Sequence, residues 1–178
     1  MNVTATMVKE LRDKTGAGMM DAKKALVEVD GDMEKAMEVL RQKGIASAEK
    51  KMGRIAAEGR VESYVDDSCG AVIELNCETD FVAKNDEFKE LASGLAEMVA
   101  KSNPADVAAL EAMTCPKCGK VIADVLKEKI ASIGEKITIR RFARYEGNVA
   151  SYIHNGKIGV LLETSAKDAE LTKDICLH

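Results

Sequence analysis

The 178-residue sequence is poor in aromatic residues and in histidine, with no Trp, three Phe, three Tyr and two His. Both His lie in the last quarter of the chain, so a histidine-based general acid or base is poorly supported. The Gly-rich phosphate and dinucleotide motifs, the nucleophile elbow and the H-E-x-x-H zinc motif are all missing. The sequence therefore predicts a protein that is not an enzyme and needs no cofactor.

The sequence also lacks a run of about 18 apolar residues that could span a membrane, and its start lacks the apolar centre of a secretory signal. Its five Cys are odd in number and scattered, which argues against a disulfide framework. With 26 Lys and Arg against 30 Asp and Glu, its charge favours neither nucleic acid nor an anionic membrane. We therefore expect a cytoplasmic globular protein whose partner is another protein.

What is present begins with three short helical patterns that form a small bundle over residues 1–50. Gly16 and Gly18 separate the first two helices, Asp32 caps the third, and Gly44 is expected to end it. The inward faces carry Met7, Val8 and Leu11, then Ala22, Ala25, Leu26 and Val29, then Ala36, Met37 and Leu40.

Met19 and Met20 stand together at the turn before the second helix. Two adjacent flexible thioethers are hard to bury side by side in so small a bundle, so they either form a contact surface or plug the core. The residues alone favour neither alternative. A polar, basic stretch follows, and residues 51–59 are predicted to be an exposed linker.

Residues 60–146 are predicted to form an α+β core. "RVESYVDD" and "GAVIELN" alternate with period two and should pair as an antiparallel hairpin. Two helices follow, and "KITIRRFARYE" supplies a third strand. The first helix carries Phe88, Leu91, Leu95, Met98 and Val99, and the second carries Val121, Val125, Ile130 and Ile133 before Gly134. The expected fold class is α+β, with helices on one side of a small antiparallel sheet.

Residues 147–178 begin a second copy of this core. Gly59, Val61, Ser63 and Tyr64 recur 88 positions later, and "GAVIEL" at 70 recurs as "GVLLET" at 159. The copy is incomplete, because only one helical segment, from Lys167 onward, follows its hairpin. We therefore expect the second hairpin to extend the first sheet or to pair with another chain as a homodimer, unless the chain is a fragment of a longer one.

The one motif that resembles a metal site is "CPKCG", with Cys115 and Cys118. A structural zinc site takes four ligands, and the remaining Cys and His offer no matching spacing. An exposed loop with reduced thiols is preferred over structural zinc, and structural zinc over a redox pair, so no bound metal is expected.

The stretch "LNCETDFVAKN" places Phe81 directly behind Asp80. Because aromatic residues are so few, the position of Phe81 calls for a structural or functional explanation. From the residues alone, a core position for Phe81 is preferred over a position on a surface that binds a partner.

Four segments in this order resemble the elongation factor Ts family, the guanine-nucleotide exchange factors for elongation factor Tu in bacteria and organelles. They are "MVKELRDKTGAGMMDAKKAL", "IELNCETDFVAKN", "IGEKITIRRFARYEG" and "SYIHNGKIGVL". The resemblance covers nearly the whole chain, and it implies a ubiquitin-associated-like head over residues 1–50. Two features depart from the family: "TCPKCGK" is unusual in it, and its longer members continue with a helical hairpin and a C-terminal module.

The resemblance also implies a function and the residues that carry it. The chain would bind elongation factor Tu in its GDP-bound and nucleotide-free forms and promote GDP release without covalent chemistry. Asp80 and Phe81 would then serve the partner, near its magnesium and nucleotide site. The implied contact residues are Thr79, Asp80, Phe81 and Val82 at the corner, Arg12, Met19 and Met20 in the head, and His154 in the second hairpin.

Two other classes of function stay open. A ubiquitin-type adaptor would use the three-helix head alone, and ubiquitin binding by residues 1–50 would favour it. A zinc-dependent nucleic-acid binder would rest on "CPKCG", and stoichiometric zinc with salt-sensitive RNA affinity would favour that.

Overall fold

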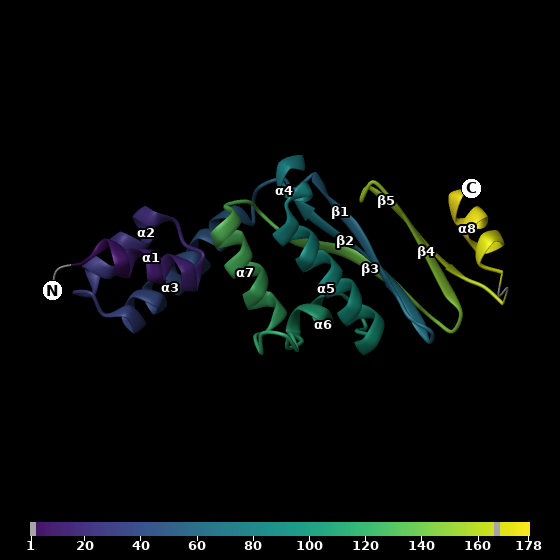
Figure 1. The fold of residues 1–178 in the computed structure, drawn as a ribbon, viewed down its shortest axis with the longest axis horizontal. Coiled ribbons are helices and arrows are strands. Elements are labelled where there is room, and N and C mark those ends of the chain that lie inside the picture. The colour runs from purple at the N-terminus through teal and green to yellow at the C-terminus, as the bar shows by residue number, and fades with distance from the viewer. Residues whose placement is uncertain (1–2, 166–167) are drawn as a thin grey trace. The chain divides into compact units, whose positions relative to one another are not determined.

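The computed structural model describes residues 3–165 and 168–178, and it divides the chain into two compact units (Figure 1). One unit contains the chain up to Arg54 together with Asp124–Lys136. The other contains Ile55–Ala123 and Ile137–His178. No helix in the described parts of either unit is both long and apolar enough to cross a membrane.

The first unit is helical, as predicted for the head. Its helices are α1 (Ala5–Thr15), α2 (Met19–Glu28), α3 (Met33–Lys51) and most of α7 (Ile122–Ile133). Gly16 ends α1 with a φ of 68°, and its amide donates to the Arg12 carbonyl at 2.8 Å. The Asp32 carboxylate accepts from the Lys35 amide at 3.1 Å and caps α3, as expected.

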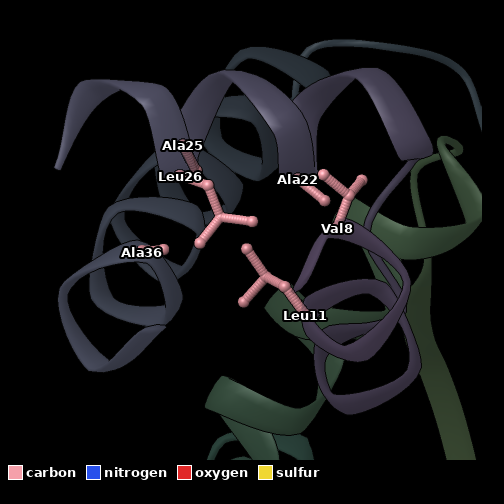
Figure 2. Close-up of a cluster of buried hydrophobic side chains, with 6 residues drawn as sticks. All are labelled: Val8, Leu11, Ala22, Ala25, Leu26 and Ala36. Atoms are coloured by element: carbon pink, nitrogen blue, oxygen red, sulfur yellow. The ribbon is translucent and has the colours of Figure 1, made fainter. Parts of the chain in front are cut away.

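The core of the head is small and built mostly from alanine and leucine (Figure 2). All six of its buried residues lie on the faces that the sequence predicted: Val8, Leu11, Ala22, Ala25, Leu26 and Ala36. The other predicted inward residues, Met7, Val29, Met37 and Leu40, are partly buried against them. The periodicity of the apolar residues therefore identified this core correctly.

The prediction that Gly44 ends the third helix is wrong, because α3 continues to Lys51. A Cβ atom added at Gly44 would lie 3.1 Å from the Cβ of Ala131 on α7, so the glycine allows close helix packing. Further along α3, the Lys51 ammonium donates to the Ile130 carbonyl at 3.3 Å. Packing against α7 thus outweighs the roughly 1 kcal/mol helix penalty of glycine.

The second unit contains the predicted three-stranded sheet, with antiparallel strands in the order β1-β2-β3. The strands are β1 (Glu58–Val65), β2 (Cys69–Cys77) and β3 (Thr138–Glu146). The helices are α4 (Asp80–Lys84), α5 (Asp86–Ser102), α6 (Val107–Ala112) and α8 (Ala169–Leu177). The short helices α4 and α6 were not predicted. The expected start of the last helix at Lys167 lies outside the described residues.

Helix α5 covers one face of this sheet (Figure 1), whereas the second helix expected on that face, α7, belongs mostly to the first unit. Phe88, Leu95 and Val99 are buried on its inner face. On β2, Ile73 and Leu75 are buried, while Val72, Glu74 and Asn76, which alternate with them, are only partly buried. This alternation places every second side chain of β2 beneath the helix.

The second hairpin consists of β4 (Val149–His154) and β5 (Ile158–Glu163), which form a separate two-stranded sheet. It packs on the face of the first sheet opposite α5 (Figure 1). The hydroxyls of Ser63 and Ser151 are 3.0 Å apart between the two layers. The expectation that this hairpin extends the first sheet is therefore wrong, because it forms a sheet of its own that packs face to face on the first.

The contact between the two hairpins is reciprocal. A Cβ atom at Gly159 would lie less than 3.0 Å from a methyl carbon of Val61, and one at Gly70 equally close to a methyl carbon of Val149. Gly70 and Gly159 are equivalent positions of the sequence repeat, and so are Val61 and Val149. A glycine of each hairpin thus packs against a valine of the other hairpin.

We expect Gly159→Ala to lower the free energy of unfolding by about 1–3 kcal/mol, because the added methyl group would overlap Val61. Adding Val61→Ala should return part of that loss, since the two residues are in contact. Gly53→Ala, where nothing lies within 4 Å, is the matched control. Urea unfolding of the two single variants, the double variant and the control measures the change in the free energy of unfolding. Additive losses from Gly159→Ala and Val61→Ala would contradict the face-to-face contact.

A second pair of variants tests the packing of α3 against α7. Gly44→Leu should destabilise the protein by about 1–3 kcal/mol, because its side chain would meet Ala131. Gly94→Leu, within α5 and facing open space, should instead leave stability unchanged or raise it by up to about 1 kcal/mol. Thermal unfolding followed by circular dichroism compares them, and equal effects would argue against the close contact at Gly44.

Candidate functional site

The candidate site begins where β2 turns into α4. Cys77, the last residue of β2, is buried, and its thiol donates to the Thr79 carbonyl at 3.2 Å. The Thr79 hydroxyl accepts from the Val82 amide at 3.4 Å and caps α4. Ala83 is buried and anchors the short helix. The corner between β2 and α4 is therefore fixed by Cys77 on the strand side and by Ala83 on the helix side.

Phe81 points away from the protein at this corner, with 81% of its surface exposed. It stands two positions before the buried Ala83, and two residues on an α-helix lie about 200° apart around the axis. Phe88, seven positions later, is fully buried at 0% exposure. The interpretation of Phe81 as a core residue is therefore wrong.

The neighbouring Asp80 is held in an ion pair. Its carboxylate lies 2.7 Å from the ammonium of Lys84, one helical turn further along. The hydrogen bond from Lys84, with a smaller contribution from the charge of Lys157, holds the pKa of Asp80 below its usual value. Asp80 therefore stays ionised to a lower pH than an unpaired aspartate.

Lys157 connects this corner to the turn of the second hairpin. Its ammonium pairs with the Glu58 carboxylate at the start of β1 and donates to the Gly59 carbonyl at 3.2 Å. Figure 1 shows α4 and the turn between β4 and β5 at the same end of this unit. The structure thus brings the corner and the second hairpin turn, which are distant in sequence, to one surface.

His154 lies on that turn and is exposed. Its ring nitrogens are held by the Tyr152 hydroxyl at 3.0 Å from Nδ1 and by the Asn155 amide at 3.2 Å from Nε2. Asn155 and Gly156 both adopt positive φ, and the Lys157 amide donates to the His154 carbonyl at 2.9 Å. The imidazole is therefore displayed on a well-defined turn.

The three head residues singled out from the sequence are all exposed and belong to the other unit. Met19 and Met20 expose 50% and 63% of their surfaces at the start of α2, and Arg12 is exposed on α1. The alternative in which both methionines plug the core is therefore wrong. They form an apolar surface on the head.

Cys115 is partly exposed and Cys118 is exposed, whereas Cys69, Cys77 and Cys176 are buried. Within residues 3–165 and 168–178, no group of three or more His, Cys, Asp or Glu could hold a metal ion. In that part of the chain the pair has no third ligand to complete a zinc site.

The sequence reasoning did not identify Glu58, Lys84 and Lys157 as part of this surface. Lys84 follows Asp80 by four residues, which is the spacing of a helical ion pair and could have revealed it. Glu58 and Lys157 are 99 residues apart, so no local pattern could have joined them.

Comparison with known proteins relates the whole chain to one family. The family model for elongation factor Ts matches residues 78–178. Elongation factor Ts of Thioalkalivibrio sulfidiphilus is 49% identical over 100% of this chain and 62% of its own length. Those of Burkholderia multivorans and Clostridium perfringens (strain SM101) are each 51% identical over 99% of this chain and 60% and 61% of their own lengths.

The chain therefore spans about 60% of the length of these relatives. The family model matches more than half of the chain, and its matched range includes the corner at Phe81 and the second hairpin. The chain belongs to the elongation factor Ts family.

Proposed function

We propose that the chain binds elongation factor Tu in its GDP-bound form and promotes release of the nucleotide. The Asp80–Phe81 corner would insert near the magnesium and nucleotide site of the GTPase. The observation that carries this proposal is the 81% exposure of Phe81 at a corner fixed by Thr79 and Ala83.

The exposed ring provides a driving force for such insertion. Burying a phenylalanine that was exposed contributes roughly 1.5–3 kcal/mol. Because the Thr79 cap and the buried Ala83 fix the corner beforehand, little ordering is needed on binding. Most of this free energy can therefore stabilise a conformation of the partner that binds the nucleotide weakly.

Exchange then follows from linkage rather than from covalent chemistry. A factor that binds the nucleotide-free partner more tightly than the GDP-bound one must weaken GDP binding by the same ratio. The chain would act as an exchange factor and not as an enzyme that makes or breaks bonds.

Asp80 would enter the interface as a paired carboxylate. Its charge is already matched by Lys84, 2.7 Å away, and Lys157 lies close enough to affect it. A paired carboxylate next to an apolar ring costs less to bring near a partner than an unpaired one. Thr79 completes the corner as the cap of α4, and Val82 completes it as the third residue of that helix.

Two further contacts are part of the proposal. Arg12, Met19 and Met20 would bind a helix of the GTPase through the head, and His154 would reach its third domain. Because both units belong to one chain, the first contact raises the effective concentration of the second. As a translation factor the chain would work in the cytoplasm.

Phe81→Ala should slow stimulated release of labelled GDP from elongation factor Tu by at least about tenfold, since a loss of 1.4 kcal/mol is a factor of ten. Its melting temperature should match that of the parent, because the ring is exposed. Phe88→Ala is the matched control and should lose about 3–5 kcal/mol of stability, because that ring is fully buried.

Two outcomes would count against insertion of the Asp80–Phe81 corner into the partner. One is a Phe81→Ala protein with unchanged melting and an unchanged rate of GDP release. The other is loss of cooperative unfolding in Phe81→Ala, which would mean that the ring supports the fold.

The head contact predicts a different kinetic change. Met19→Ser with Met20→Ser should leave melting unaltered, because both side chains are largely exposed. The concentration of chain needed for half-maximal GDP release should rise several-fold, while the rate at saturation stays the same, because a docking contact is lost and the corner is intact. A lower saturating rate with an unchanged half-maximal concentration would contradict this role.

A further inference from the structure

The loop between α6 and α7 carries two cysteines that the proposed function does not use. It is closed as a small hairpin, with a bridge between Thr114 and Val121. The Cys115 amide donates to the Lys120 carbonyl at 2.7 Å, and the Gly119 amide donates to the Cys115 carbonyl at 2.8 Å. The backbone therefore holds Cys115 and Cys118 on one tight turn.

A glycine and an ion pair support this turn. Gly119 has a φ of 69°, a left-handed conformation that favours glycine, at the point where the chain reverses. Lys117 lies 3.7 Å from the Glu97 carboxylate of α5. The loop is thus ordered by its own hydrogen bonds and tied to the neighbouring helix.

The two thiols lie three residues apart on this one closed turn. The Cys118 thiol and the backbone amides of Cys118 and Lys117 are donors that favour the thiolate form of Cys115 and so lower its pKa. Burial alone would raise the pKa of the Cys115 thiol, but these hydrogen bonds and the charge of Lys117 lower it overall. Cys115 is therefore prepared to react as a thiolate, with a second thiol beside it.

Exposure separates this pair from the other cysteines. Cys115 and Cys118 can be reached from solvent, whereas Cys69, Cys77 and Cys176 are buried. A nucleophilic, accessible thiol next to a resolving thiol is the arrangement found in redox-active dithiols.

We propose that Cys115 and Cys118 form a redox-active dithiol that exchanges with small-molecule disulfides. The Cys115 thiolate attacks one sulfur of the small disulfide, whose S–S bond breaks to release one thiolate. Cys118 then loses its proton and attacks the sulfur of Cys115, which releases the second thiol. The protein dithiol loses two electrons to form one disulfide, and the small disulfide is reduced to two thiols.

A metal site fits these residues less well than a dithiol. Zinc in a structural site takes four ligands, and the described part of the chain gathers only these two thiols. Thiol–disulfide exchange needs only two sulfurs, and both are in place. The inference does not rest on the proposed role in nucleotide exchange.

The experiment uses the full chain with oxidised glutathione as the probe. After treatment at neutral pH and quenching of free thiols, peptide mass mapping should find Cys115 and Cys118 joined in one peptide. Cys69, Cys77 and Cys176 should remain free. The Cys118→Ser variant should instead stop at a stable mixed disulfide between glutathione and Cys115, because the resolving thiol is missing.

A kinetic measurement provides a second test. Iodoacetamide should modify Cys115 several-fold faster in the folded chain than in the same chain unfolded in urea, because the loop stabilises the thiolate. The Cys115→Ser variant should form no disulfide in this loop and should keep the parent's circular dichroism.

Three results would overturn the proposal. They are equal alkylation rates in the folded and unfolded chains, no disulfide between Cys115 and Cys118 in the presence of glutathione disulfide, and stoichiometric zinc that protects both thiols. None of these experiments measures GDP release. The proposed exchange function can therefore fail while the dithiol is confirmed, and the dithiol can fail while the exchange function is confirmed.

Discussion

The second unit depends on the close approach of two hairpins, which is possible because Gly70 and Gly159 stand where each hairpin meets a valine of the other. Any side chain at Gly70 or Gly159 would meet the opposite valine at less than 3.0 Å. With the layers held apart, the 3.0 Å contact of Ser63 with Ser151 would open. The same approach brings Lys157 to Glu58, and so the charges around Asp80 depend on a packing contact elsewhere in the unit.

The internal repeat was visible in the sequence, but the way its copies pack was not. A repeat shows that two segments have similar folds, and two similar hairpins can meet either edge to edge or face to face. The useful signal was glycine at equivalent positions inside two strands, because glycine weakens a strand unless another backbone or side chain approaches closely. Interpreted in that way, Gly70 and Gly159 would have predicted the face-to-face packing that the structure has.

Periodic elements could be predicted from the sequence, whereas elements defined by a few residues or by tertiary contacts could not. Apolar spacing identified α5, the core of the head and the three strands, because long segments repeat their pattern several times. Helix α4 has five residues, too few for a period, and only its cap at Thr79 marks it. At Gly44 the local preference for a helix end was real, but contact with Ala131 on a segment distant in sequence decided the outcome.

The corner at Phe81 shows why the scarcity of a residue cannot tell where its side chain lies. A single-turn helix on a sheet can bury only one side, and here the buried side carries Ala83 while the opposite side carries Phe81. Folding usually buries the larger apolar residue, so this choice leaves roughly 1.5–3 kcal/mol of burial free energy unused by the fold. Departures from local rules of this kind gather at functional sites. The free energy that the fold leaves unused at Phe81 is available to whatever surface buries that ring.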